Sequence, residues 1–185
     1  MKKNMVISIM SKDRPGIVSD VSNAIFELNG DIADLNQTVL AGYFTMILAT
    51  QIEESVTKED ILAAISHIQS ETSLEVSVKE VHSDFIEQIN PLNEAYVITV
   101  QGKNKTGIVS HVSKLCAQHQ ANILDLDTVL KDGVYSMIIQ ADMKHSSSSI
   151  DALKAELTHY ASDADLTIMI QHNDIFRATN EVTLH

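Results

Sequence analysis

Residues 12–22 read KDRPGIVSDVS, and the chain contains a second version of this stretch, KNKTGIVSHVS, at residues 103–113. The offset between the two is 91 positions, residue 103 against residue 12. In both, a glycine separates an apolar run from a stretch with apolar residues at helical spacing. Glycine tolerates positive φ, and the first N–H groups of a helix have no intrahelical partners. Each stretch therefore predicts a strand, a turn and a helix start, and such a turn can hold a small carboxylate group.

The spacing of apolar residues predicts the other elements of the first half. Strands are expected where apolar residues alternate or are β-branched, helices where they recur at three or four positions, and a hairpin where Ala41-Gly42 joins two strands. In chain order these are a strand at 5–10, a helix at 17–28, strands at 32–40 and 43–50, a helix at 58–70 and a strand at 74–78. Asn29-Gly30 ends the first helix, and Thr57 is expected to cap the second.

The second half repeats this order, with a change of one residue in the offset between the two copies. Its predicted elements are strands at 96–100, 123–130, 134–141 and 166–170, with helices starting at 108 and 150. The offset grows to 92 at the last strand, so we expect one inserted residue, in the loop at 146–149. The expected division is a first domain at 1–82, a linker at 83–94, a second domain at 95–172 and a loose C-terminal tail at 173–185.

This order predicts an α+β architecture. Two split βαβ units with right-handed crossovers give a four-stranded antiparallel sheet with both helices on one face, the ferredoxin-like fold. Two such domains in tandem are expected. Because each half has only about 80 residues, we expect the domains to lean on each other or on another chain in a homo-oligomer.

Composition limits the classes of function. The net charge is −12, and both halves are acidic, so neither offers a broad basic face for nucleic acid. The single cysteine, Cys116, fits a reducing compartment, falls on an apolar helix face and is expected in the core. The start is too short and polar for a signal peptide, and no stretch approaches a membrane span. We therefore expect a cytoplasmic protein without direct contact with nucleic acid or membrane.

The repeated residues resemble the signature of the ACT domain family. DRPGIV at 13–18 followed by NGDI at 29–32, and NKTGIV at 104–109 followed by ANI at 121–123, carry the resemblance. The layout is similar to tandem ACT regulators of glycine cleavage genes that have no DNA-binding domain of their own. The resemblance implies a small-molecule sensor that acts on transcription through contact with another protein.

The resemblance also implies where a ligand would bind. In ACT domains that bind amino acids, the ligand lies between two domains, held by the turn after the first strand and by the polar residue that starts the second strand. Carried over, these positions are Asp13, Arg14, Gly16, Ile17 and Asp31 in the first copy, and Asn104, Lys105, Gly107, Ile108 and Asn122 in the second.

The second copy has the more suitable chemistry for an amino acid. Its two amides, Asn104 and Asn122, offer donors and acceptors together, whereas Asp13 and Asp31 repel a carboxylate unless Arg14 and the turn N–H groups offset them. The second copy has Thr106 where the family has proline, which frees the turn. The alternative is a purely structural role, in which the glycines only allow the chain to turn and the polar residues only form hydrogen bonds with backbone groups.

Other functions have weaker support in the sequence. An enzyme would need a nucleophile elbow, a phosphate loop or a metal cluster, and we expect no catalytic residue, cofactor or metal. An RNA-binding module of the same strand order needs exposed aromatics and a basic surface. A structural adaptor without ligand stays open. We expect a regulatory protein that senses a small amino acid, with glycine as the candidate, and contacts a transcription factor.

Overall fold

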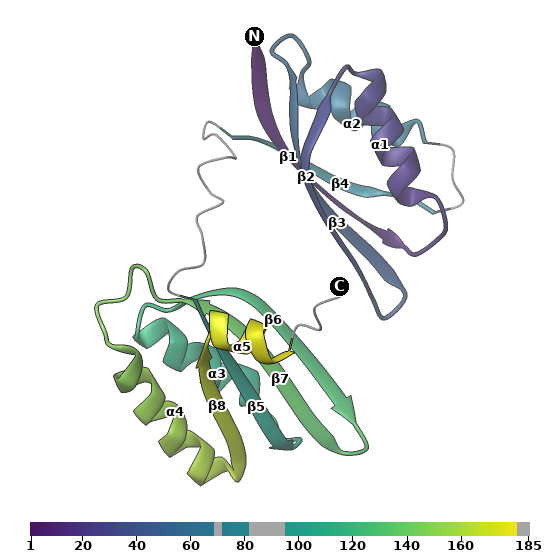
Figure 1. Ribbon diagram of the computed structural model, residues 1–185. Coiled ribbons are helices and arrows are strands. Elements are labelled where there is room, and N and C mark those ends of the chain that lie inside the picture. The colour runs from purple at the N-terminus through teal and green to yellow at the C-terminus, as the bar shows by residue number, and fades with distance from the viewer. Residues whose placement is uncertain (69–71, 82–94, 181–185) are drawn as a thin grey trace. The chain divides into compact units, whose positions relative to one another are not determined.

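The computed structural model describes residues 1–68, 72–81 and 95–180 (Figure 1). The chain divides into two compact units, Met1–Asn90 and Pro91–His185. Both units have the order βαββαβ, and the second ends in one further helix.

The elements lie close to where the apolar spacing predicts them. In the first unit they are β1 (Lys2–Lys12), α1 (Ile17–Glu27), β2 (Asp31–Leu40), β3 (Tyr43–Glu53), α2 (Lys58–Ser66) and β4 (Glu75–Val81). In the second they are β5 (Ala95–Lys103), α3 (Ile108–Gln118), β6 (Asn122–Lys131), β7 (Val134–Asp142), α4 (Ile150–Ala164), β8 (Leu166–His172) and α5 (Asn173–Asn180).

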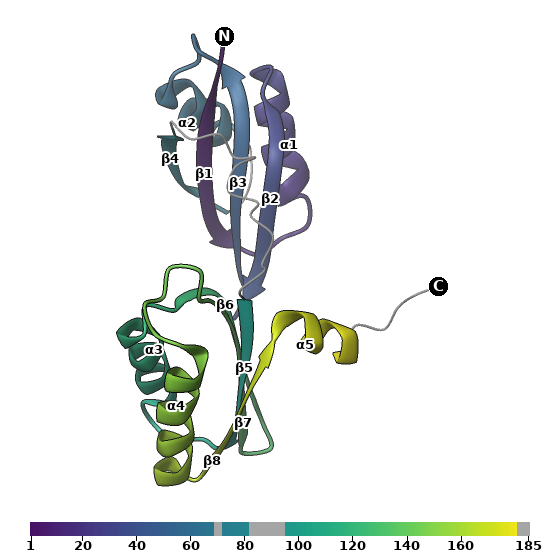
Figure 2. The same cartoon turned by 60° about the vertical axis from the view of Figure 1, so that its left-hand side comes forward.

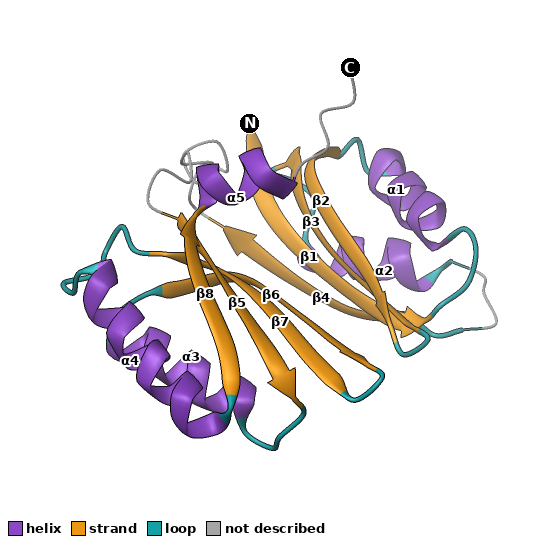
Figure 3. Cartoon of the chain, turned by 60° about the horizontal axis from the view of Figure 1, so that its bottom comes forward, coloured by secondary structure: helices purple, strands orange, loops and turns teal. Residues whose placement is uncertain are grey.

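Each unit is built on one four-stranded antiparallel sheet. The strand order is β2-β3-β1-β4 in the first and β6-β7-β5-β8 in the second, so the first strand of each unit is central. The two crossover helices of each unit lie on one face of its sheet (Figure 3). The prediction of two tandem ferredoxin-like domains of the α+β class is confirmed.

The core of each unit lies between the sheet and its helices. In β1, Met5, Ile7 and Ile9 are buried, and the residues that alternate with them face the other side of the sheet. Cys116 is fully buried in the core of the second unit, as predicted, and burial raises the pKa of its thiol. The same burial removes it from reagents in solution.

The two hairpins use the same turn geometry. Ala41 and Gly42 both have positive φ, 53° and 80°, and Asp132 and Gly133 have 53° and 78°. Positive φ at both central residues matches the right-handed twist of the flanking strands. Ala41 is the unusual member of the four, because alanine has no side-chain group that favours this region.

The outer strands β2 and β6 contain a bulge at the same place. The register shifts between Ile32 and Asp34, and between Ile123 and Asp125. At each bulge the aspartate side chain accepts a hydrogen bond from the next backbone N–H, at 2.8 Å from Leu35 and 3.0 Å from Leu126. The carboxylate thus satisfies a backbone donor where the ladder is disrupted.

Helix α2 is shorter than the predicted helix at 58–70. It ends at Ser66, and residues 69 and 70 lie outside the described part of the chain. Its N-cap is Thr57, as predicted, in a capping box in which Asp60 accepts from the Thr57 backbone N–H at 2.8 Å. That bond, with a second from the Thr57 hydroxyl, lowers the pKa of Asp60.

The C-terminal stretch is not the loose tail that the sequence predicted. Asn173–Asn180 forms helix α5, while residues 181–185 lie outside the described part. Figure 2 shows α5 on the side of the second sheet away from α3 and α4, and the helix contacts β5 and β8. Ala95 and Val97 face that side, and they are 0% and 5% exposed. The helix therefore packs over one end of the second sheet.

Candidate ligand-binding site

Both glycine turns have the conformation that requires glycine. Gly16 precedes α1 with φ of 91°, and Gly107 precedes α3 with φ of 96°. Each is the N-cap of its helix, and neither helix receives a side-chain cap. The first N–H groups of α1 and α3 are therefore placed to bind a carboxylate or water.

Arg14 is engaged within the first turn. Its Nη2 donates to Oδ2 of Asp20 at 2.7 Å, and its Nη1 donates to the carbonyl of Pro15 at 3.0 Å. The backbone N–H of Asp13 donates to the carbonyl of Gly42 at 3.0 Å, which ties the turn to the β2–β3 hairpin. The guanidinium thus stabilises the turn itself, and its charge is already shared with Asp20.

The second turn is held by different partners. The ammonium of Lys105 donates to the carbonyl of Ala164, at the end of α4, where the helix dipole favours a cation. His111 replaces Asp20, 91 positions on, and its Nδ1 lies 2.9 Å from the carbonyl of Gly107. Its ring stacks on Tyr160 with centroids 5.2 Å apart. The basic residue of the second turn is thus also occupied within its own unit.

The predicted residues of the first unit fall at opposite ends of its sheet. Asp31 pairs with Gln51, and Gln51 pairs with Asn4 near the start of β1. Asp13 follows Lys12 at the other end of the same strand. Eight residues of strand between Asn4 and Lys12 span about 27 Å. Asp13 and Asp31 therefore cannot hold one small ligand within a single unit.

The second unit has the same separation. Asn122 pairs with Asp142, which pairs with Ala95 at the start of β5, whereas Asn104 follows the end of that strand. Asn104 and Asn122 are both exposed. Asn104 and Asn122 therefore cannot hold one small ligand within a single unit.

Ile17 and Ile108 contribute to the core. They are 1% and 2% exposed, and their side chains belong to the two core clusters. At these two positions only the backbone N–H groups face the turns. The side chains at the predicted sites are therefore those of Asp13, Asp31, Asn104 and Asn122, with Arg14 and Lys105 already engaged.

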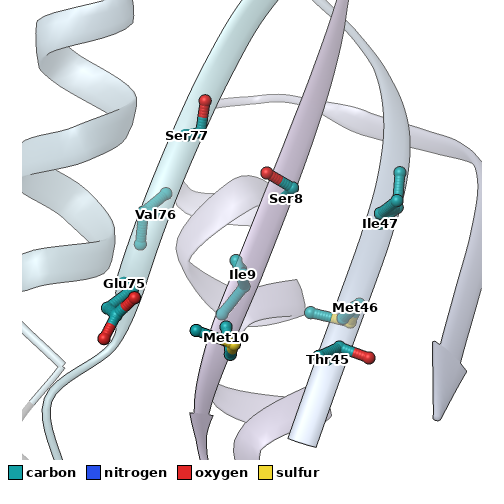
Figure 4. Close-up of a pocket in the computed structure, with 9 residues that line it drawn as sticks. All are labelled: Ser8, Ile9, Met10, Thr45, Met46, Ile47, Glu75, Val76 and Ser77. Carbon is teal, nitrogen blue, oxygen red and sulfur yellow. The ribbon is translucent and has the colours of Figure 1, made fainter.

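The first unit has two adjoining hollows on the sheet face away from its helices. The face hollow has a volume of about 450 Å³ and extends over three adjacent strands (Figure 4). Its lining residues are Ser8, Ile9, Met10, Thr45, Met46, Ile47, Glu75, Val76 and Ser77. The corner pocket has about 290 Å³ and is lined by Met10, Ser11, Lys12, Tyr43, Thr72, Ser73 and Glu75.

Sequence reasoning missed the corner pocket. Met10 and Glu75 line both hollows, so the two adjoin. The available signal was the alternation of β1, which places Met10 and Lys12 on the face away from the core. That Glu75, at the start of β4, lies beside these two residues follows only from the strand register.

A groove between α3 and α4 brings together residues that the sequence left without a role. It has a volume of about 360 Å³, and its lining includes His111, Lys114, Glu156, His159, Tyr160 and Asp163. The buried His119 lies beneath, with Nε2 3.3 Å from Oε1 of Glu156. Mixed charges on two neighbouring helices give this groove no single preferred ligand chemistry.

Two kinds of feature are absent from the described residues. Within 1–68, 72–81 and 95–180, no group of three or more His, Cys, Asp or Glu side chains is placed to hold a metal ion. No helix in that same part of the chain is long and apolar enough to cross a membrane.

The chain resembles known proteins over both units. The family described as ACT domain matches residues 3–79 and 94–171. A UPF0237 protein of Methanocaldococcus jannaschii is 33% identical over 86 residues, which are 46% of this chain and 96% of that protein. A UPF0237 protein of Clostridium acetobutylicum is 36% identical over 86 residues, 46% of this chain and 97% of that protein. These relatives have about half the length of this chain.

Solved structures match the whole layout. A protein of unknown function from Galdieria sulphuraria has a TM-score of 0.77 at 20% identity, covering 92% of this chain and 98% of its own. A candidate glycine cleavage system transcriptional repressor has a TM-score of 0.60 at 16% identity, covering 92% and 97%. At these identities the likeness shows a shared fold. With both units matched by one family, the chain belongs to the ACT domain family and carries two copies of the domain in tandem.

Proposed function

We propose that this protein is a non-catalytic regulator that binds a small amino acid and passes its bound state to another protein. The observation that carries the proposal is the pair of left-handed glycine turns, each at the uncapped start of a helix, in an ACT domain. A helix start of this kind favours a carboxylate, which every free amino acid has.

The separation of Asn104 from Asn122 supports a mechanism of switching. A ligand bound to both kinds of position must contact two ACT units at once. It then favours the relative orientation that suits it, which is the physical requirement for a conformational switch. The proposed output is protein contact with a transcription factor, with glycine cleavage genes as the candidate target and glycine as the candidate ligand.

The amino-acid part is tested by ligand-induced stabilisation of the full chain. Thermal unfolding is measured with each of the twenty amino acids, because a ligand that binds only the folded state raises the transition temperature. We expect glycine or a close relative to give a shift that Asn122→Ala and Asn104→Ala remove. Asn36→Ala changes another exposed asparagine, on β2, and should retain the shift. No shift with any amino acid would refute sensing.

The partner is tested by affinity capture from cell extract with and without the amino acid that stabilises the protein. A regulator that signals its ligand should capture a transcription factor to a different extent in the two conditions. Capture that does not depend on the amino acid would favour the structural adaptor instead. Size-exclusion chromatography with light scattering, in the same two conditions, measures the oligomeric state.

A further inference from the structure

The corner pocket carries one cation and one anion at a spacing that suits a zwitterion. Glu75 pairs with Met10, and Lys12 is two residues further along β1, so Lys12 and Glu75 are diagonal neighbours. Such neighbours have Cα atoms about 7–8 Å apart. Both side chains are on the sheet face away from the core, because the residue between Met10 and Lys12, Ser11, is the buried one.

The charged groups of Lys12 and Glu75 have no partners among the described residues. Among the described residues, neither Lys12 nor Glu75 forms an ion pair or a side-chain hydrogen bond. The hydroxyl groups of Tyr43 and Ser73 and the apolar side chain of Met10 complete the lining. An ammonium and a carboxylate at the two ends of one ligand would therefore each meet the opposite charge, with a thioether between them.

The pocket volume limits the size of the ligand. At about 290 Å³ it is at the lower limit of the roughly 300–1,000 Å³ that is typical of small-molecule pockets. This volume admits one free amino acid.

The same corner of the second unit is paired differently. There Gly102 takes the place of Ser11, and it pairs with Leu166 in the ladder between β5 and β8. A Cβ added at Gly102 would lie 2.6 Å from Cδ2 of Leu166 and 3.1 Å from the carbonyl of Asp165. Lys105 further ties this corner to Ala164. The start of β8 therefore packs directly against the end of β5.

Ser11 stands where the second unit has Gly102. Its side chain is buried, and its hydroxyl donates to the carbonyl of Lys12 at 3.0 Å. A residue with a Cβ cannot accept the close approach that Gly102 allows, and the first-unit ladder ends at Met10 and Glu75, one pair earlier than its counterpart.

From these observations we infer that the corner pocket of the first unit binds a small zwitterionic amino acid, with Lys12 holding its carboxylate and Glu75 its ammonium. The inference rests on the proposed sensing of an amino acid and goes beyond it, because it assigns the ligand to a site that is an alternative to the glycine turns. It also reverses the expectation that the second copy has the better pocket.

The test measures amino-acid binding by the full chain with isothermal titration calorimetry. Lys12→Gln and Glu75→Gln should each weaken binding about 10- to 100-fold, the value of one charge-assisted hydrogen bond. The N-acetyl and the amide derivatives of the same amino acid should lose affinity by similar factors, because each lacks one charge. Lys103→Gln is the matched control, since Lys103 corresponds to Lys12 but Thr167 stands where the first unit has Glu75.

The outcomes separate this site from the proposed function. Wild-type affinity in both Lys12→Gln and Glu75→Gln overturns the corner pocket. If Asn104→Ala or Asn122→Ala then abolishes binding, amino-acid sensing stands with its site at the turns. A loss of affinity in Lys103→Gln equal to that in Lys12→Gln also overturns the pocket. If the wild-type chain binds no amino acid, both the pocket and the sensing role are refuted.

Discussion

Replacing Gly30 with alanine should destabilise the first unit, although alanine occupies the same position in the second. A Cβ at Gly30 would lie 2.7 Å from Cγ2 of Ile25, whereas carbon atoms in contact are about 3.5–4.0 Å apart. The counterpart of Gly30 is Ala121, and the counterpart of Ile25 is Cys116, which has no Cγ2. Each unit thus pairs one larger residue with one smaller residue at this contact.

The size of the effect follows from overpacking. Gly30→Ala should cost about 1–3 kcal/mol, since the helix and the start of β2 must move apart by roughly 1 Å. Ile25→Cys alone should cost about 1–3 kcal/mol through lost burial. In the double variant the new methyl group fills space that Cγ2 left, so its cost should be about 1–2 kcal/mol below the sum of the single costs.

The assay is urea unfolding of the full chain, with native-state hydrogen exchange of peptides from each unit to assign the change. The reverse pair, Cys116→Ile with Ala121→Gly, is the control in the second unit and should show coupling of the same sign. Single costs that add to within about 0.3 kcal/mol would refute the reasoning, because independent sites are additive to about that limit.

Four further predictions concern local features. Ala41→Asn should stabilise the first unit by about 0.5–1 kcal/mol in urea unfolding, because asparagine tolerates positive φ, and an unchanged midpoint would contradict this. Thr57→Ala should cost about 1 kcal/mol by the same assay through the lost cap. The lowered pKa of Asp60 means that its contribution is present above the unfolded pKa of about 3.9 and is lost as pH falls through the folded pKa, so Asp60→Asn should flatten the acid limb of stability against pH. Labelling of Cys116 by iodoacetamide should require unfolding and accelerate in denaturant, and fast labelling of the native protein would show that the thiol is accessible.

The sequence predicts the fold well because its duplication constrains every element twice. The alternation of β1 reappears in β5, and the helical spacing after Gly16 reappears after Gly107. A pattern that arose by chance in one half would not recur in the other. Helix α5 has no counterpart among the described elements of the first unit, so the duplication does not predict it. It has only eight residues, too few to be stable alone, and it depends on contact with β5 and β8.

The candidate site was less predictable. The turns and their glycines follow from local spacing, whereas the distance between Asn104 and Asn122 depends on the helix returning the chain to the far end of the sheet. The corner pocket depends on Glu75 pairing with Met10, which brings Glu75 diagonally beside Lys12. Strand register of this kind joins residues far apart in the chain, and local sequence patterns do not report it.

The bulges at Asp34 and Asp125 bear on how a duplicated chain avoids misassembly. A protein with two units of one topology emerges from the ribosome one unit at a time, and repeats of this kind are prone to exchange strands or to extend into fibres along an uncovered border. At the border formed by β2 or β6, an incoming strand would meet a break in the hydrogen-bonding pattern and a donor already taken by a carboxylate. The charge repels further acidic copies as well. The duplication therefore adds a second sheet edge that is protected in the same way as the first.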